Sequence, residues 1–369
     1  MAPFSSHRPQ KSARLALNVG AVALLLALAL AGCKSKFARL PALEADAAAT
    51  SVSGLSSGAY MAGQFHIAHS RNVVGAGIIA GGPFGCAQSI FAEQMPGPGT
   101  AFLNLSRAVN GCMLDAMRNW GVPNVALLAE RARKLAREDR IDPLEALTAS
   151  RVYLFSGTED HTVLPSIVHA TAELYEALGV AKDRLALITE VPAGHAFVTP
   201  GKGIACGRTA KPYITACGYD QAGDLLAHIY GGLKPRAPQT TGEFLTFEQR
   251  EFVRDLSGHG LADAGMLYVP AACRAAPGCR VHIVFHGCNQ HLSGVGEAFV
   301  RDSGFANWAE HNHLLVLFPQ ATASPINPQA CWDWWGYTGR DYLTRAGPQI
   351  LAVRRMLDRL ASKAARVGI

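Results

Sequence analysis

Short apolar runs alternate along the chain with segments of helical periodicity, and this alternation constrains the fold more than any other feature of the sequence. The apolar runs cover residues 73–80, 152–155, 185–191, 281–285 and 314–318, and several end in loops that contain glycine. The helical segments include residues 60–70, 166–178, 305–311 and 350–365. Continuous apolar runs are typical of strands that are buried on both faces. The sequence therefore predicts an α/β fold, with a mostly parallel sheet and helices on both faces.

A serine framed by two glycines follows a further predicted strand at residues 50–53. The motif Gly-Leu-Ser-Ser-Gly at residues 54–58 matches Gly-x-Ser-x-Gly, a sharp turn from strand to helix that exposes the hydroxyl of Ser56. Both glycines are needed because a side chain there would clash with the adjoining strand and helix. Residues 59–68 are predicted to be an amphipathic helix. Since the chain holds 37 glycines, the motif can also arise by chance. Whether Ser56 is catalytic therefore depends on whether the sequence also offers an acid and a base to act with it.

Two residues of complementary type follow later strands. Asp160 stands after a glycine turn, where a carboxylate can accept the N–H of an imidazole; Glu159 is its nearest rival. His195 stands after another glycine turn, where it could take the proton of Ser56 and return it to a leaving alkoxide. The order Ser56, Asp160, His195, each at a strand end, is that of the α/β-hydrolases. The sequence therefore predicts a catalytic triad on an α/β-hydrolase fold.

The oxyanion hole of such an enzyme needs two backbone donors, and the sequence places them far apart. The first is the N–H of Ser57, the residue after the nucleophile, and the second comes from a loop with a His-Gly motif on an earlier strand. No such motif precedes Ser56, but His-Gly-Cys-Asn-Gln occurs at residues 286–290, which makes the N–H of Cys288 the expected second donor. This order predicts a circularly permuted fold, which is tolerated where chain termini lie close together on the surface.

Taken together, these motifs resemble the permuted, single-domain poly(3-hydroxybutyrate) depolymerases. The similar stretches run from about Thr50 to the C-terminus and comprise residues 54–62, 212–214, 219–223, 286–290, 319–320 and 331–336. The resemblance implies that Ser56 is the nucleophile, Asp160 the orienting acid and His195 the base, with the N–H groups of Ser57 and Cys288 as oxyanion hole. It also implies hydrolysis of 3-hydroxyalkanoate polyester, or of its oligomers, through an acyl-enzyme. Many secreted members append a linker and a polymer-binding domain, and neither is found in this sequence.

Two other functions use the same sequence features. An esterase for acetyl or feruloyl groups on polysaccharides needs the same machinery. A lipoprotein that binds ligands without catalysis is a further alternative. No metal or organic cofactor is expected, because nothing in the sequence calls for one and six other histidines lie on predicted helices or at a helix end. These are His66, His69, His169, His228, His311 and His313.

A cluster of tryptophans lies between residues 332 and 337. Buried aromatic residues are common in protein cores, and Trp332 and Trp334 are expected there. Strand-like alternation would place Trp335 on the opposite face from Trp334. In the family that the motifs resemble, a tryptophan of this segment lines the substrate cleft, so Trp335 is the expected substrate contact.

The start of the chain has the three parts of an export signal. Arg8, Lys11 and Arg14 precede an uncharged apolar run at residues 15–30, and small residues follow it. The sequence Leu-Ala-Gly-Cys that ends at Cys33 looks like a bacterial lipobox, in which the cysteine is lipidated and becomes the N-terminus. A cleaved signal without lipidation and a membrane anchor of about 20 residues are the alternatives.

These features predict three parts of the chain. Residues 1–32 are expected to be a lipoprotein-type signal peptide, residues 33–49 a short Ala-rich tether, and residues 50–369 a single catalytic domain. The residue after Cys33 is Lys34 and not an aspartate, which in lipoproteins of this kind usually goes with the outer membrane. The protein is therefore expected to be exported, in the periplasm or on the outer membrane and anchored through Cys33, or else extracellular. Its oligomeric state is left open.

The other eight cysteines are an even number in a protein sent to an oxidising compartment, which predicts four disulfides. The sequence leaves 105 pairings open. Proximity along the chain favours Cys86 with Cys112, Cys206 with Cys217, Cys273 with Cys279, and Cys288 with Cys331. A zinc site is the competing explanation, but it usually needs a close Cys-x-x-Cys pair, and the sequence has none.

The charge of the chain argues against a nucleic-acid partner. Lys and Arg number 34 and Asp and Glu 28, but six of the cations and none of the acids precede Leu40. The remainder is balanced at 28 against 28, since 34 minus six is 28. Nucleic-acid binding would need a basic face on the folded body. The expected partner is therefore a polyester or oligoester substrate.

Overall fold

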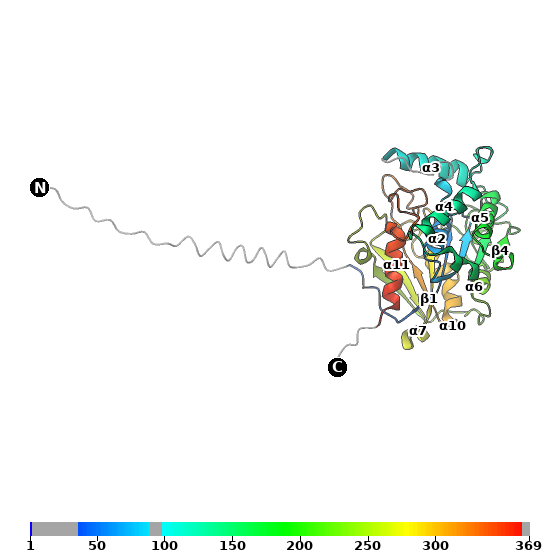
Figure 1. Ribbon diagram of the computed structural model, residues 1–369. Coiled ribbons are helices and arrows are strands. Elements are labelled where there is room, and N and C mark those ends of the chain that lie inside the picture. Colours follow the sequence, from blue (N-terminus) through cyan, green and yellow to red (C-terminus); the bar gives the residue numbers. More distant parts are fainter. Residues whose placement is uncertain (2–35, 89–97, 364–369) are drawn as a thin grey trace. The chain divides into compact units, whose positions relative to one another are not determined.

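An eight-stranded sheet forms the centre of the fold (Figure 1). The computed structural model describes Met1, residues 36–88 and residues 98–363. The strand order is β4-β3-β2-β1-β10-β11-β9-β8. Each strand pairs in parallel with the next from β4 through β3, β2, β1 and β10 to β11. Strand β9 is antiparallel to both of its neighbours, β11 and β8. This arrangement confirms the mostly parallel sheet that the apolar runs predict.

The elements follow one another in an alternating pattern. The strands are β1 Asp46–Leu55, β2 Val73–Ile79, β3 Arg151–Phe155, β4 Leu185–Ile188, β5 Phe197–Thr199, β6 Ile204–Ala205, β7 Ile214–Ala216, β8 Glu243–Glu248, β9 Ala264–Val269, β10 Arg280–Phe285 and β11 Leu314–Phe318. The helices are α2 Ser57–Ala68, α3 Pro98–Cys112, α4 Val125–Arg137, α5 Pro165–Ala177, α6 Gln221–Tyr230, α7 Ala271–Ala275, α8 Leu292–Val295, α9 Ala298–Asp302, α10 Phe305–His311 and α11 Pro348–Ala361. Strands β5, β7 and β6 form a small parallel sheet of their own.

All five apolar runs form strands of the large sheet, namely β2, β3, β4, β10 and β11. The four predicted helical segments correspond to α2, α5, α10 and α11, with ends that differ by a few residues. Strand β4 ends at Ile188, three residues before the apolar run does. Apolar character alone therefore located these elements, because most are buried on both sides.

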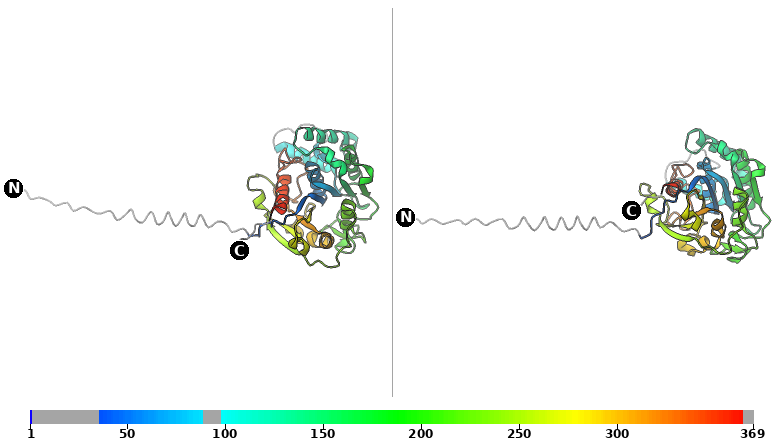
Figure 2. Two further views of the ribbon diagram at one scale, coloured as in Figure 1. Left: turned by 60° about the horizontal axis from the view of Figure 1, so that its bottom comes forward. Right: turned by 90° about the horizontal axis from the view of Figure 1, so that it is seen from below.

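Helices cover both faces of the sheet. A Cβ atom added to Gly77 of β2 would lie 2.1 Å from Cδ1 of Leu225, so α6 packs closely on that face. A Cβ atom added to Gly63 of α2 would lie 3.6 Å from Cδ1 of Ile78. Since neighbouring strand residues point to opposite faces, α2 and α6 cover opposite sides. In Figure 2 the red helix α11 lies beside the blue helix α2, in agreement with their contacts.

The helix that follows Ser56 differs from its prediction. The sequence predicts an amphipathic helix, but every residue of α2 is buried. On α2, the side-chain Nε2 of Gln64 donates to the carbonyl oxygen of Asp333 at 2.9 Å. The ring of Tyr60 stacks on that of Trp334, with 4.1 Å between centroids. The prediction of an amphipathic helix is wrong because the tryptophan segment covers the side that would otherwise face water.

The folded body begins before residue 50. Strand β1 starts at Asp46. The N–H groups of Leu43 and Ala45 both donate to the carbonyl oxygen of Leu360, at 3.0 Å, near the end of α11. The predicted tether over residues 33–49 is wrong from Ala38 onward, because the carbonyl oxygen of Ala38 accepts the N–H of Glu248 at 2.8 Å and Leu40 is buried in the core.

The chain divides into two compact units, Met1–Phe37 and Ala38–Ile369. Within the second unit, β1 is the first strand along the chain, yet it lies in the interior of the sheet between β2 and β10. The hydrogen bonds to Leu360 bring the start of this unit beside the end of α11. Adjacent ends are what a circularly permuted fold needs, and the permutation itself stays a prediction.

No helix in the described ranges has both the length and the apolar character needed to cross a membrane. The predicted signal peptide after Met1, its apolar run and Cys33 lie outside the described residues. The export signal and the lipidation therefore stay predictions.

The eight remaining cysteines form four disulfides. The pairs are Cys86–Cys112, Cys206–Cys217, Cys273–Cys279 and Cys288–Cys331, the same four that proximity along the chain favours. Disulfides persist in oxidising compartments, so the fold is one of an exported protein.

Candidate active site

Ser56 lies in a strained turn between β1 and α2. Its φ is 57° and its ψ is −123°. A positive φ is uncommon for a residue with a side chain and persists where the surroundings enforce it, often at functional sites. The N–H of Ser56 donates to the carbonyl oxygen of Ile79 at 2.9 Å. The backbone thereby holds Ser56 at the carboxyl edge of the sheet, where α/β proteins bind their ligands.

The two glycines of the motif leave no room for side chains. A Cβ atom on Gly54 would lie 2.2 Å from the carbonyl oxygen of Gly58. A Cβ atom on Gly58 would lie 2.3 Å from the carbonyl oxygen of Phe285 at the end of β10. Helix α2 therefore begins directly against the strand that precedes the His-Gly-Cys-Asn-Gln loop. The structure confirms the strand-to-helix turn that the sequence predicts.

Two further loops leave the same edge of the sheet and touch each other. The N–H of Thr158, after β3, donates to the carbonyl oxygen of Val191 at 2.9 Å. The N–H of Glu159 donates to the carbonyl oxygen of Ala193 at 3.1 Å. A Cβ atom on Gly157 would lie only 2.1 Å from that oxygen. A glycine at position 157 is what lets the loop of Asp160 approach the loop of His195.

Asp160 and His195 form a buried pair. The Nδ1 atom of His195 lies 2.8 Å from Oδ2 of Asp160, and the two residues are 6% and 2% exposed. The other carboxylate oxygen accepts the N–H groups of Thr162 and Val163, at 2.8 and 3.0 Å. A carboxylate can only accept, so Nδ1 of His195 carries the hydrogen, and in the neutral form of the ring Nε2 is left with the lone pair that a base needs. The rival Glu159 is exposed and lies 4.0 Å from His161.

Ser56 is 8% exposed. Within residues 36–88 and 98–363 its hydroxyl forms no hydrogen bond, including to His195. In enzymes without bound substrate, catalytic hydrogen bonds are often long and tighten only in the complex. The structure brings all three residues to one edge of the sheet, and the hydrogen bond between Ser56 and His195 stays a prediction.

The two expected oxyanion donors also lie at this edge. Neither the N–H of Ser57 nor that of Cys288 donates to an acceptor in the part of the chain that the structure describes. Unpaired N–H groups at a helix start and a neighbouring loop are what an oxyanion hole requires. The hydroxyl of Ser57 itself accepts the N–H of Trp332 at 3.3 Å. Their role in catalysis stays a prediction.

His286 holds the peptide group that carries the Cys288 donor. Its Nδ1 donates to the carbonyl oxygen of Gly287 at 2.7 Å, and its Nε2 accepts the N–H of Ala321 at 3.1 Å. Burial lowers the pKa of His286 to about 4. The neutral ring fits both contacts, since a proton on Nε2 would face the N–H of Ala321. The sequence pattern gave His286 no role of its own, although its position directly before Gly287 was the available signal.

The tryptophan segment, residues 331–337, is not a strand. The carboxylate of Asp333 accepts the N–H groups of residues 335, 336, 337 and 338 and thereby folds the segment into a turn. The strand-like alternation that would place Trp335 and Trp334 on opposite faces is therefore absent. All three tryptophans are buried, and Trp335 is 4% exposed. Trp332 and Trp334 lie in the core as expected, and a substrate contact by Trp335 stays a prediction.

Two other buried histidines have structural partners. The ring nitrogens of His66 contact the Tyr175 hydroxyl at 3.0 Å and the Ser150 hydroxyl at 3.1 Å. His282 lies between the hydroxyls of two serines of β1. Across the described residues, no group of three or more His, Cys, Asp or Glu side chains could hold a metal ion.

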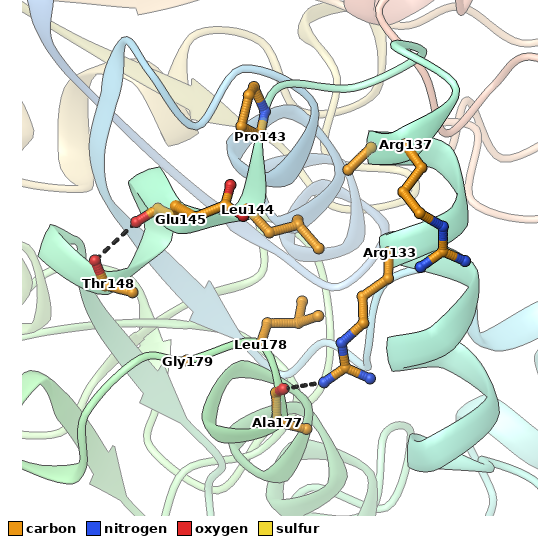
Figure 3. Close-up of a pocket in the computed structure, with 10 residues that line it drawn as sticks. Arg133, Arg137, Pro143, Leu144, Glu145, Thr148, Ala177, Leu178 and Gly179 are labelled. Carbon is orange, nitrogen blue, oxygen red and sulfur yellow. Dashed lines mark hydrogen bonds between the residues drawn. The ribbon is translucent and has the colours of Figure 1, made fainter.

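A pocket of about 570 Å³ opens elsewhere, between α4, the turn at residues 144–149 and the end of α5 (Figure 3). Both of its arginines already have partners: Arg133 donates to the carbonyl oxygen of Ala177 at 2.6 Å, and Arg137 donates to Glu130 at 2.7 Å. None of the candidate catalytic residues lines it. The pocket is therefore separate from the site around Ser56.

No protein-family model matches the chain. The chain is 38% identical over 351 residues to "Poly(3-hydroxybutyrate) depolymerase" of Delftia acidovorans, which covers 93% of the chain and 66% of the relative, just under two thirds of its length. It is 31% identical over 342 residues to "Polyhydroxybutyrate depolymerase" of Talaromyces funiculosus, which covers 88% of the chain and 92% of the relative. The chain belongs to the polyhydroxybutyrate depolymerase family. This confirms the family that the sequence motifs resemble.

Solved structures of the polyhydroxybutyrate depolymerase family share the fold. The crystal structure of PHB depolymerase from Penicillium funiculosum matches with a TM-score of 0.74 and 30% identity, covering 88% of this chain and 98% of that one. A serine-to-alanine variant of PHB depolymerase complexed with an R3HB trimer matches with a TM-score of 0.75, 30% identity and the same coverage. The α/β-hydrolase fold that the motifs predict is thereby confirmed.

Proposed function

We propose that this chain is a serine esterase that hydrolyses poly(3-hydroxybutyrate) or its 3-hydroxyalkanoate oligomers. The observation that carries the proposal is the buried pair of Asp160 and His195, 2.8 Å apart, at the sheet edge where the strained turn holds Ser56. Membership of the polyhydroxybutyrate depolymerase family supports the choice of substrate.

In the proposed reaction, Nε2 of His195 takes the proton of Ser56 as Oγ attacks the ester carbonyl carbon. The N–H groups of Ser57 and Cys288 stabilise the negative charge on the carbonyl oxygen. The intermediate collapses, the bond to the alkoxide breaks, and His195 gives it the proton, which leaves an acyl group on Ser56. Water then attacks this acyl group and loses a proton to His195. The bond between the acyl carbon and Oγ breaks, His195 returns the proton to Oγ, and the acid and the free serine are released. Asp160 keeps the imidazole in the required tautomer throughout.

The products that the purified protein releases from a panel of ester substrates test the proposal. The expected result is 3-hydroxybutyrate from amorphous polymer and from short oligomers, with little acetate or ferulate from acetylated or feruloylated xylan. Predominant release of acetate or ferulate would favour the polysaccharide esterase instead. A fluorophosphonate probe separates catalysis from ligand binding: absence of labelling on Ser56 in the folded, oxidised protein would contradict any serine esterase.

We also propose that Cys33 is lipidated and anchors the protein to a membrane, with residues 1–32 removed as a signal peptide. The Leu-Ala-Gly-Cys sequence supports this, and Lys34 supports an outer-membrane position. Labelled palmitate should enter the wild-type protein in a bacterial host and be absent from Cys33→Ser. Equal labelling, or release of both proteins into the periplasm, would contradict the anchor.

A further inference from the structure

The loop that carries the Cys288 donor is held by a buried side chain, Gln290. Gln290 is 1% exposed. Its Oε1 accepts the N–H of Gly287 at 2.8 Å. Its Nε2 donates to the carbonyl oxygens of Tyr213 at 2.9 Å and Pro212 at 3.2 Å. Each contact needs a specific partner type: the N–H requires an acceptor and the two carbonyls require a donor, and a carboxamide provides both.

The same contacts connect the oxyanion loop to the loop of the proposed base. The carbonyl oxygen of Tyr213 accepts a second hydrogen bond, from the N–H of Phe197 at 2.9 Å. Phe197 begins β5, two residues after His195. A continuous path of hydrogen bonds therefore runs from Gly287, through the Gln290 amide and Tyr213, to the strand that follows His195.

The backbone around Cys288 explains why this matters for the oxyanion donor. A peptide unit is planar and trans, so its C=O and N–H point in opposite directions. The carbonyl oxygen of Gly287 is held by Nδ1 of His286 at 2.7 Å and by the N–H of Gln290 at 3.2 Å. The direction of the Cys288 N–H is consequently fixed. Gln290 binds Gly287 twice: its side-chain Oε1 accepts the N–H of Gly287, and its backbone N–H donates to the carbonyl oxygen of Gly287.

We propose that Gln290 is a positioning residue that holds the Cys288 oxyanion donor and the His195 loop in a fixed relation. The proposal rests on the proposed esterase function. It does not give Gln290 a contact with substrate. Its physical basis is that an oxyanion donor acts only when it is already aimed at the charge that develops, so a small misplacement costs rate and leaves binding of the neutral ester nearly unchanged.

Two variants of Gln290 test this. Gln290→Met keeps the length and removes all three side-chain hydrogen bonds, whereas Gln290→Glu keeps an acceptor for Gly287 and loses the donor to Tyr213. The matched control is Asn312, which is also buried and lies just before β11, at the end of that strand opposite the active site. Its Oδ1 accepts the N–H of Lys234 at 2.8 Å, and its Nδ2 donates to the carbonyl oxygens of Lys234 and Trp308 at 3.0 and 2.8 Å. Asn312→Leu therefore breaks an equivalent buried amide outside both loops.

The readout is hydrolysis of 4-nitrophenyl butyrate, with active sites counted by complete fluorophosphonate titration. For both Gln290 variants kcat should fall about 10- to 100-fold while KM changes less than about threefold. Asn312→Leu should lose thermal stability to a similar degree and keep kcat within about threefold.

The outcomes separate the two proposals. If the wild type is active and both Gln290 variants keep the kcat of Asn312→Leu, the positioning role is overturned. A rise in KM with kcat unchanged would overturn it as well, because it would indicate substrate contact. If Gln290→Met does not fold, Gln290→Glu decides alone. A wild type that neither hydrolyses esters nor takes the probe would instead contradict the esterase function.

Discussion

The Nδ1 atom of His195 lies 2.8 Å from Oδ2 of Asp160, and the other oxygen of that carboxylate is held by two backbone N–H groups. Asp160→Asn should keep the acceptor for those N–H groups and the fold. Its amide nitrogen would face Nδ1 and favour the tautomer with the hydrogen on Nε2, which cannot act as base. We expect kcat to fall by about 10⁴-fold.

Glu159→Gln is the matched control for this prediction, since that side chain is exposed and its carboxylate lies 4.0 Å from His161 instead. Its kcat should stay within about twofold. Ester hydrolysis and thermal melting of both variants are measured side by side. A larger loss in Glu159→Gln than in Asp160→Asn would reverse their roles.

Ser56→Ala should lower turnover of a short nitrophenyl ester by about 10⁵- to 10⁶-fold without loss of the fold, by analogy with triad deletions in other hydrolases. Ser53→Ala is the control on the same strand. It removes a hydroxyl that lies 2.8 Å from Nε2 of buried His282, so it should lower the free energy of unfolding by about 1–3 kcal/mol and leave turnover per folded molecule unchanged. Near-normal hydrolysis by Ser56→Ala would refute the nucleophile.

Gly58→Ala should destabilise the protein strongly. The added Cβ atom would lie 2.3 Å from a backbone oxygen of Phe285, and neither α2 nor β10 can shift without moving the site. We expect a loss of at least about 2 kcal/mol in the free energy of unfolding, measured by denaturant titration. In Gly63→Ala on the same helix, the nearest atom would be 3.6 Å away, so stability should stay the same or rise by up to about 1 kcal/mol. Equal stabilities for the two variants would contradict the close approach at Gly58.

Much of this site could be predicted because its signals are local in sequence. The turn at Ser56 needs glycines at fixed offsets, and Asp160 and His195 each follow an apolar strand and a glycine turn. Parallel strands gather their carboxyl ends at one edge, so residues far apart in sequence were placed together without any contact information.

The parts that the sequence did not reveal depend on contacts between distant segments. The turn of the tryptophan segment is made by Asp333, whose carboxylate replaces the hydrogen bonding of a strand, so alternation had no meaning there. Helix α2 lacks a solvent face because Trp334 stacks on Tyr60. The amide of Gln290 works through Tyr213, 77 residues away. The burial of such residues and the choice of their partners depend on tertiary structure, and neither secondary-structure propensity nor hydrophobic periodicity reveals them.

The disulfide between Cys288 and Cys331 should support activity as well as stability. It ties the oxyanion loop to the tryptophan segment. Replacing both cysteines with serine keeps the Cys288 N–H in the backbone but frees the loop, so we expect kcat to fall about tenfold along with about 2–5 kcal/mol of stability.

The control for that prediction is the double serine variant of Cys273 and Cys279, a disulfide before the start of β10, at the opposite end of the strand from Cys288. It should lose stability without loss of kcat at a temperature where both variants are folded. Equal kcat values in the two double variants would dispose of the link between the Cys288–Cys331 disulfide and catalysis.

Stability should decline as the pH falls below about 6.5. Burial lowers the pKa of His282 and His66 from 6.5 to about 3, and that of His286 to about 4. Between pH 6.5 and 4 the unfolded chain therefore binds protons that the folded chain does not. The stability of the neutral, buried rings is fully present above pH 6.5 and is lost as the pH falls, with a slope of up to about 1.4 kcal/mol per pH unit for each histidine.

His282→Gln tests the origin of this decline. The ring of His282 lies 2.6 Å from the Ser51 hydroxyl and 2.8 Å from the Ser53 hydroxyl, and a carboxamide can hydrogen-bond to hydroxyls without taking up a proton. The variant should be less stable than the wild type at pH 8, because packing around the ring is lost, but its free energy of unfolding should fall less steeply between pH 6.5 and 5. Urea titrations at half-unit steps of pH measure both slopes. Parallel curves for the two proteins would mean that His282 takes up no additional proton on unfolding, and the decline would then have to come from other groups.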